Sequence, residues 1–227
     1  GLDGSLAGDA QAARQAIEAL AERRGIVNGV ARFARFHRDA DHADELLTVS
    51  PPRPLRRPFA EGYRLYVPDD LGRRGIFRAG PLSGHKSNNY LGNRLALDHA
   101  RQLGFDETLL FGPDDAIADA ATATLFAVST DGTLGTPPLA AGALPGIIRE
   151  VILQGAQALG TAVEERHLNV ADILEAPAAF LTNALLPVMP VSHLGRRALA
   201  STSNPMVARV REFVEQQAHA SASVLSS

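Results

Sequence analysis

The pattern of hydrophobic and polar positions changes its period several times along this chain of 227 residues. Apolar residues at helical spacing indicate five helices. Three of these helices cover residues 10–24, 144–160 and 169–176, and another begins at residue 205. The fifth carries Leu91, Leu95 and Leu103 on one face and ends at Gly104. Asp9 and Asn169 can each accept a hydrogen bond from the helical turn that follows, so they mark two of the helix starts.

Period-two alternation and short continuous apolar runs indicate strands between these helices. The strands lie at residues 29–36, 63–68, 107–112, 123–129, 161–168 and 178–191. Residues 37–62 and 69–84 are polar and rich in proline or glycine, which is typical of loops. We therefore predict an α/β (α+β) chain. Its parts are a small α/β domain over residues 1–75, an interdomain loop at 76–84 and a large domain over 85–227.

Composition narrows the class of protein. With 45% hydrophobic and 21% charged residues, the chain has the balance of a soluble globular protein. A net charge of -3 gives no basic surface for nucleic acid, and no apolar run reaches the roughly 18–20 residues that cross a membrane. The absence of cysteine excludes disulfides, thiolate nucleophiles and cysteine-bound zinc. The sequence begins without a signal-peptide pattern, so the cytoplasm is the expected location.

Lys86, in the segment GHKSNNYLGN at residues 84–93, is the only lysine of the chain, and the other basic residues are all arginines. A lysine amine can lose its proton and act as a nucleophile, whereas the guanidinium of arginine stays protonated. Lys86 is therefore a candidate catalytic residue. The alternative is an ordinary solvated surface charge, and the residue alone leaves both open.

Four segments in this order form a larger pattern. They are HKSNNYLGN (85–93), AIADAATATLF (116–126), TPPLAAGALPGIIRE (136–150) and FLTNALLPVMPV (180–191). Together they resemble the class IV, or branched-chain-type, family of pyridoxal-phosphate enzymes. That family includes branched-chain aminotransferases, D-amino-acid aminotransferases and 4-amino-4-deoxychorismate lyases. The resemblance implies the two-domain D-amino-acid aminotransferase-like fold, pyridoxal 5'-phosphate as cofactor, and a homodimer.

The resemblance assigns chemical roles to two side chains. Lys86 matches the lysine that forms a Schiff base with the cofactor aldehyde and then moves a proton between the substrate α-carbon and the cofactor. Asp119 stands where the family usually has glutamate facing the pyridine nitrogen, which a carboxylate keeps protonated. Because aspartate is one methylene shorter, the contact can be longer or bridged by water. The alternative for Asp119 is an ordinary loop aspartate.

Four further residues match the positions around the cofactor phosphate. The backbone amides of Ile147 and Ile148, at a predicted helix start, match the amides that hold the phosphate. Asn183 and Ala184 match a second turn on the phosphate side. Many aminotransferases have threonine where Ile148 and Ala184 stand, so this chain lacks those two hydroxyl groups. The alternative for the isoleucines is simple helix core.

The resemblance also concerns the beginning of the chain. Family members carry a basic R-x-x-H-x-x-R-L helix with a phosphate-binding arginine before the segment where this sequence starts. The resemblance therefore implies an incomplete N-terminal small domain. Nearby, HRDADHADE at residues 37–45 places His37 and His42 among carboxylates, as in some metal sites. These histidines lack helical i,i+4 pairing, so we interpret the segment as a charged loop and expect no metal.

Three functions follow from the resemblance. The segment NALLPVMPV (183–191) is most similar to the lyase branch, which favours 4-amino-4-deoxychorismate lyase, an enzyme of folate biosynthesis that releases pyruvate and 4-aminobenzoate. The alternative is a class IV aminotransferase for branched-chain or D-amino acids, which the letters NYL after Lys86 favour. A degenerate, non-catalytic relative is the third hypothesis, motivated by Asp119, Ile148 and Ala184. Both enzymatic hypotheses imply a small-molecule amino substrate, and the sequence does not identify which one.

Overall fold

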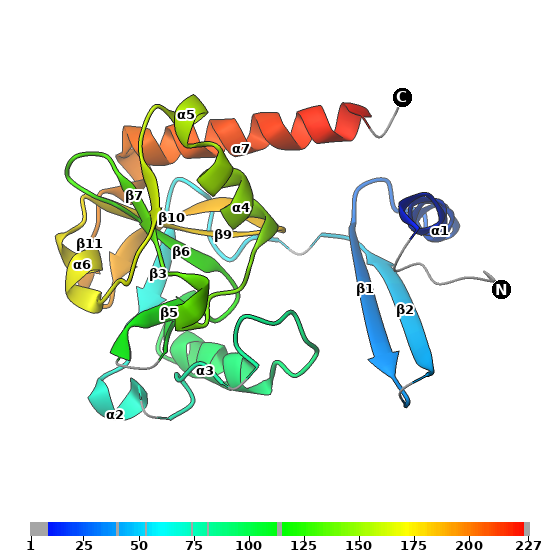
Figure 1. Cartoon of the computed structure of the whole chain (residues 1–227), viewed down its shortest axis with the longest axis horizontal. Coiled ribbons are helices and arrows are strands. Elements are labelled where there is room, and N and C mark those ends of the chain that lie inside the picture. The colour runs from blue at the N-terminus through cyan, green and yellow to red at the C-terminus, as the bar shows by residue number, and fades with distance from the viewer. Residues whose placement is uncertain are drawn as a thin grey trace. The chain divides into compact units, whose positions relative to one another are not determined.

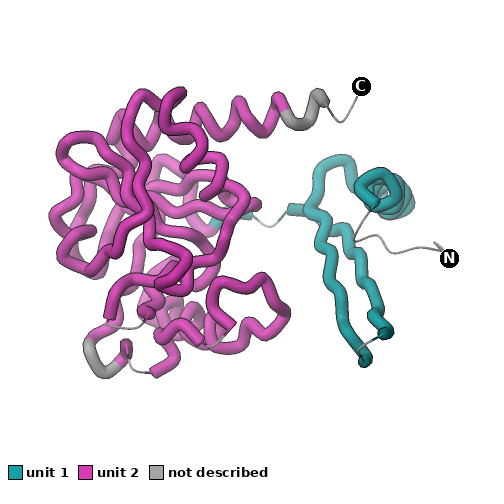
Figure 2. Tube along the Cα trace, viewed as in Figure 1, with its two compact units in different colours: residues 1–55 teal, residues 56–227 magenta. Residues whose placement is uncertain are grey.

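The computed structural model describes residues 9–39, 41–52, 54–73, 75–80, 82–112 and 115–224. The chain divides into two compact units, residues 1–55 and 56–227 (Figure 2). This division precedes the interdomain loop expected at residues 76–84, and the domain boundaries predicted from the sequence stay a prediction. The small domain that was expected to be incomplete covers residues 1–75, of which residues 1–8 lie outside the described residues.

The first unit consists of one helix and a two-stranded antiparallel sheet (Figure 1). Its elements are α1 (Ala10–Arg23), β1 (Val30–His37) and β2 (Ala43–Ser50). The predicted cap of α1 is confirmed, because the Asp9 carboxylate accepts a 2.9 Å hydrogen bond from the Ala12 amide. The interpretation of residues 37–62 as loop was wrong over β2, which pairs with β1 along its whole length.

The second unit is built on one nine-stranded sheet with strand order β5-β4-β3-β10-β9-β6-β7-β8, and β11 pairs with β10. The strands are β3 (Tyr63–Tyr66), β4 (Glu107–Phe111), β5 (Ile117–Ala120), β6 (Thr124–Val128), β7 (Leu134–Thr136), β8 (Val163–Glu165), β9 (Ala178–Asn183), β10 (Leu186–Leu194) and β11 (Arg197–Ala198). Most neighbours are antiparallel, whereas β3 runs parallel to β4 and to β10. The predicted strand at 178–191 is therefore two strands of a hairpin that turns at residues 184–185.

Among the described residues, six α-helices accompany this sheet. They are α2 (Asp70–Arg73), α3 (Leu91–Gln102), α4 (Ile147–Gln154), α5 (Ala156–Leu159), α6 (Val170–Glu175) and α7 (Pro205–Val224). In Figure 1, α7 (red) runs along one side of the strands with α4 and α5 beside it. Within the described residues, none of the helices combines the length and apolar character that crossing a membrane requires.

The core beneath α4 and α7 shows why these helices pack where they do. Phe126 of β6 and Phe180 of β9 lie opposite each other, and their rings stack with centroids 5.1 Å apart. The last helix, α7, contributes three valines that are buried and belong to the same apolar cluster as this ring pair. They are Val207, Val210 and Val214.

Two helix predictions need correction. The predicted helix over 144–160 is divided into α4 and α5 at Gly155, where an added Cβ would lie 2.4 Å from the Phe213 ring of α7. On α3, the predicted apolar face is exposed, whereas Ala96, Leu97 and Ala100 are buried. The exposed leucines are Leu91, Leu95 and Leu103. Small alanines form the inner face of α3 because they allow the helix to lie close to β4.

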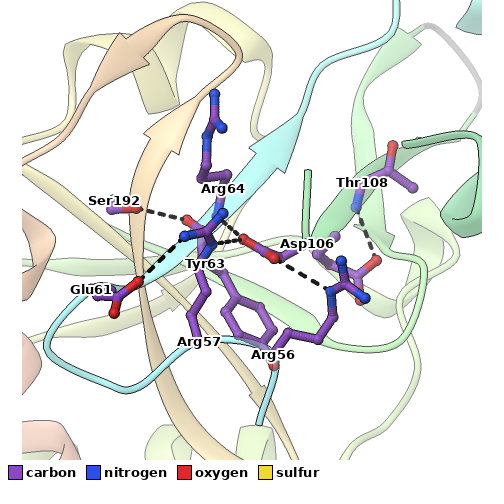
Figure 3. Close-up of polar contacts among 9 residues, drawn as sticks. Arg56, Arg57, Glu61, Tyr63, Arg64, Asp106, Thr108 and Ser192 are labelled. Carbon is purple, nitrogen blue, oxygen red and sulfur yellow. Dashed lines mark hydrogen bonds and ion pairs between the residues drawn. The ribbon is translucent and has the colours of Figure 1, made fainter. Parts of the chain in front are cut away.

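An ion-pair cluster holds the beginning of the second unit against β4 (Figure 3). The buried Asp106 carboxylate accepts hydrogen bonds from Arg57 Nε at 2.6 Å, from Arg56 Nε at 3.4 Å and from the Arg64 amide at 2.9 Å. The carboxylate in turn raises the pKa of Arg57. Residues 56–64 are thereby fixed to the start of β4 by charge-assisted hydrogen bonds.

Candidate active site

One cavity of about 660 Å³ opens in the second unit, and all six predicted site residues line it. They are Lys86, Asp119, Ile147, Ile148, Asn183 and Ala184. The cavity walls come from the 82–93 segment, from β5 and the turn after it, from the start of α4, and from the β9–β10 turn. Segments far apart in the sequence therefore meet at one site of a size typical for small molecules.

Lys86 lies in the loop before α3, and its side chain is exposed. Its Nζ lies 5.5 Å from the centroid of the Tyr90 ring. The Tyr90 hydroxyl donates a 3.0 Å hydrogen bond to the Ala121 carbonyl, and burial raises the pKa of this hydroxyl, with a smaller contribution from the Asp119 carboxyl group. The only lysine thus projects from an open loop next to an anchored aromatic ring.

Asp119 forms the buried acidic part of the cavity. Its carboxyl group accepts hydrogen bonds from the amides of Ala120 and Leu144, both at 3.1 Å. Burial raises its pKa from 3.8 to about 7, although both amides act in the opposite direction. No lysine, arginine or histidine of the described residues forms an ion pair with this carboxyl group. Within the part of the chain that the structure describes, Asp119 is therefore a buried acid without an ion-pair partner for its ionised form.

The start of α4 presents free backbone amides to the cavity. Gly146 is the N-cap, and no side chain of the described part of the chain caps this end. The first amides of a helix have no acceptor within the helix, and the helix dipole adds partial positive charge there. Ile148 packs its side chain into the apolar core, while Ile147 is 74% exposed at the cavity. Core packing and an anion-binding amide are both compatible with Ile148.

The turn between β9 and β10 is held by Asn183. Its Nδ2 donates to the Thr122 carbonyl at 3.0 Å, and its Oδ1 accepts from the Leu185 amide at 2.9 Å. The side chain therefore fixes the turn that carries the exposed Ala184 and ties it to the wall formed by residues 120–123. Asn183 has a positioning role through these two bonds.

Sequence reasoning missed Glu107, whose carboxyl group is bonded to the same wall of residues 120–123. Its buried carboxyl group accepts hydrogen bonds from the amides of Thr108 and Ala121 and from the Thr122 hydroxyl. The Ala121 carbonyl on the other side receives the Tyr90 hydroxyl and the Asn93 amide. Glu107 directly follows Asp106 at the start of the run ETLLF, so nothing in the sequence indicates that its carboxyl group is buried.

The histidine-rich segment of the first unit has a different explanation from a metal site. His42 Nδ1 lies 2.8 Å from Asp39 Oδ1, and this contact lowers the pKa of Asp39. Among the described residues, no three or more His, Asp or Glu side chains gather closely enough to hold a metal ion. His37 and His42 therefore gain no support as ligands.

Comparison with known proteins decides the family. The family model described as amino-transferase class IV matches residues 9–194. The chain belongs to this family. It is the family of pyridoxal-phosphate enzymes that the four sequence segments predicted.

Curated relatives match this chain over only part of their own length. The branched-chain-amino-acid aminotransferase of Escherichia coli K12 is 30% identical over 133 residues, which are 58% of this chain and 43% of that protein. A putative relative with the same name from Methanocaldococcus jannaschii is 29% identical over 132 residues, which cover 58% of this chain and 44% of that protein. The match thus spans less than half the length of these relatives.

Solved structures confirm the predicted fold class. A hypothetical aminotransferase from Mycobacterium tuberculosis, in its PLP-bound form, has a TM-score of 0.76 and 22% identity, over 91% of this chain and 75% of that one. A putative 4-amino-4-deoxychorismate lyase from Legionella pneumophila has a TM-score of 0.74 and 23% identity, over 87% and 73% of the two chains. At these identities the likeness concerns the fold alone.

Proposed function

We propose that the chain binds pyridoxal 5'-phosphate in this cavity and acts on the amino group of a small molecule, with Lys86 as the residue that attaches to the cofactor. The observation that carries the proposal is the meeting of three groups around one cavity: a lone lysine, a buried carboxyl group and an uncapped helix start. Membership of the class IV family supports it independently.

The residues present fit the three chemical parts of this cofactor. An amine suits its aldehyde, a carboxyl group suits its ring nitrogen, and free helix amides suit its phosphate. Asp119 is informative, because a protonated ring nitrogen would bring the positive charge that its buried carboxyl group lacks. When bound, the cofactor supplies a ring that accepts the electron pair left on the substrate carbon.

The chain's own residues then have separate tasks. Lys86 Nζ holds the cofactor and, once displaced by the substrate amine, moves the proton of the substrate α-carbon. The Asp119 carboxylate holds the proton on the ring nitrogen. The amides of Ile147 and Ile148 fix the phosphate, with the turn of Asn183 and Ala184 forming the adjacent wall.

For the reaction, we propose elimination of pyruvate from 4-amino-4-deoxychorismate to give 4-aminobenzoate, a step of folate synthesis in the cytoplasm by a homodimer. The segment NALLPVMPV at 183–191 supports this choice. The second candidate is amino-group transfer to a 2-oxo acid, supported by the 30% identity to branched-chain aminotransferases. A non-catalytic relative is the third.

The cofactor proposal is tested by adding pyridoxal phosphate to the purified protein. We expect a visible absorption band, and borohydride reduction should leave the cofactor covalently on Lys86 in a peptide mass spectrum. Because the chain has a single lysine, a modified lysine identifies the site without ambiguity. Lys86→Arg keeps the charge and should abolish the band and the modification. A parent protein that takes up no cofactor contradicts the proposal and leaves the non-catalytic relative.

The reaction is tested separately on protein that binds the cofactor. Production of 4-aminobenzoate and pyruvate supports the lyase. Formation of glutamate from 2-oxoglutarate and a branched-chain or D-amino acid supports the aminotransferase and contradicts the lyase.

A further inference from the structure

Thr182 of β9 carries a hydroxyl group that is buried without a partner. The residue is 2% exposed, and its Oγ1 has no hydrogen-bond partner among the described residues. An unpaired buried hydroxyl destabilises the folded protein, because it has lost its hydrogen bonds to water without gaining others. Arg149 in the same wall also has one unpaired atom, Nε, but its Nη2 donates to the Pro137 carbonyl and to Glu165. Thr182 has no second polar side-chain atom.

This hydroxyl lies in the wall next to the start of α4. Thr182 is directly opposite Thr124 on the neighbouring strand β6, so both side chains are on the same face of the sheet. A Cβ added to Gly146, the N-cap of α4, would lie 3.7 Å from Thr124 Oγ1. Thr124 and Thr182 both line the cavity. This strand pair therefore places Thr182 beside Thr124, whose own hydroxyl lies near the start of α4 and also hydrogen-bonds to Asp119.

The arrangement points to Thr182 as a further anion-binding residue, whose hydroxyl donates to the phosphate of the ligand at the start of α4. This inference rests on the proposed function and names the side chain that adds to the backbone amides. Of the other residues expected at this end, Ile147, Ile148 and Ala184 have apolar side chains, and both polar atoms of the Asn183 side chain are bonded to the backbone of the chain. Without Thr182, the phosphate contacts assigned to them come from the backbone.

Burial explains why water does not satisfy this hydroxyl. Its oxygen is excluded from solvent, while the residue itself forms part of the cavity wall. A ligand packed against the wall can reach a threonine hydroxyl, because one rotation of about 120° around χ1 moves the hydroxyl to the position that the methyl group held. Hydrogen bonds to a charged acceptor such as phosphate are stronger than those between neutral groups.

The test compares Thr182→Val with a matched control. Thr136→Val removes a hydroxyl that is equally buried but bonded to the Leu125 carbonyl at 2.8 Å. We expect Thr182→Val to weaken pyridoxal phosphate binding about tenfold or more in a spectroscopic titration, with affinity for pyridoxal, which has no phosphate, unchanged. The ligand-free variant should be as stable as the parent or more stable. Thr136→Val should lose stability and keep its affinity, and Thr182→Ser should bind like the parent.

A second probe separates this inference from the proposed function. Inorganic phosphate, compared with chloride at equal ionic strength, should raise the melting temperature of the parent protein and raise it less in Thr182→Val. This result supports the phosphate contact even if the parent binds no pyridoxal phosphate. Equal loss of affinity for pyridoxal phosphate and pyridoxal, or no loss of either phosphate effect, would overturn the role of Thr182 and leave the proposed cofactor site untouched.

Discussion

Asp106 and Asp119 are two buried aspartates of the same unit with opposite surroundings. Asp106 lies among Arg56, Arg57 and the Arg64 amide, and its charge is balanced inside the fold (Figure 3). Asp119 receives two amides and no cation from the described residues, and burial raises its pKa to about 7. The carboxyl group that joins segments is paired with arginines, whereas no ion pair among the described residues balances the one in the cavity.

Glu107 is a third buried acid, and it is intermediate between them. Its oxygens accept bonds from two amides and one hydroxyl, but burial still raises its pKa, and Arg101 lowers it only in part. The three acids teach that burial alone does not mark a site. Asp119 differs from the two structural carboxyl groups because it both lies in a cavity wall and forms no ion pair among the described residues.

The largest predicted effect is the pH dependence of ligand-free stability through Asp119. Between about pH 4 and 7 the folded chain holds this proton and the unfolded chain does not, so the free energy of unfolding falls as pH rises. A pKa change from 3.8 to about 7 corresponds to on the order of 4 kcal/mol. Asp119→Asn should therefore lose about 1 kcal/mol near pH 4, because its amide nitrogen accepts no hydrogen bond, and become more stable than the parent above pH 7, as measured by urea denaturation.

The same variant should bind pyridoxal phosphate more weakly, since a neutral amide does not balance a protonated ring nitrogen. A stability difference between Asp119→Asn and the parent that stays constant from pH 4 to pH 8 would contradict the comparison, because Asp119 would then behave like a paired carboxylate.

Removing Asp106 should have the opposite sign. Asp106→Ala leaves two arginines and the Arg64 amide without their shared acceptor, so we expect a loss of about 2–3 kcal/mol in unfolding free energy at pH 7. Asp98→Ala is the matched control, because Asp98 forms a more exposed pair with Arg94 and should change stability by less than about 0.5 kcal/mol. Equal effects of the two variants would show that the Asp106 cluster adds nothing by being buried.

Glu107→Gln should give a smaller change in unfolding free energy, and the size of this change should depend on pH. At acid pH both side chains are neutral, and the variant should lose about 1 kcal/mol because its amide nitrogen no longer accepts a hydrogen bond. Since burial raises the pKa of Glu107, this loss should shrink as the pH rises above 4.5. The measurement is again urea denaturation at several pH values. If the loss of unfolding free energy grew with pH, Glu107 would instead behave like Asp106.

The smallest effect is expected for Arg57→Ala. Its side chain is 31% exposed, and Arg56 remains beside Asp106, so the loss should be below about 1 kcal/mol. Raising the salt concentration should reduce the difference from the parent, because exposed charges are screened. A loss larger than that of Asp106→Ala would mean that Arg57 acts through packing.

Local signals predicted the elements that local chemistry determines. Asp9 and Asn169 cap α1 and α6 as expected, since a cap depends on residues within one turn. The exposed leucines of α3 and the break at Gly155 were not predictable, because they depend on β4 and on Phe213 from α7. The polar strand β2 was missed because its regular pairing with β1 compensates for weak apolar alternation.

The same limit applies to the site. Ordered motifs predicted that Lys86, Asp119 and the start of α4 belong together, and they do line one cavity. The roles assigned to them stay predictions. Glu107 and Thr182 could not be assigned from sequence, because a carboxyl group that supports a turn and a hydroxyl without a partner are defined by neighbours far along the chain.

The uncapped start of α4 has a consequence for how occupancy can be followed. The amide protons of Ile147 and Ile148 have no acceptor within their helix, and no described side chain caps them. In solution these protons exchange rapidly with water, unlike those further along the helix. An anion that accepts hydrogen bonds from them would slow their exchange. Two backbone resonances thus report filling of the site without any label, chromophore or turnover.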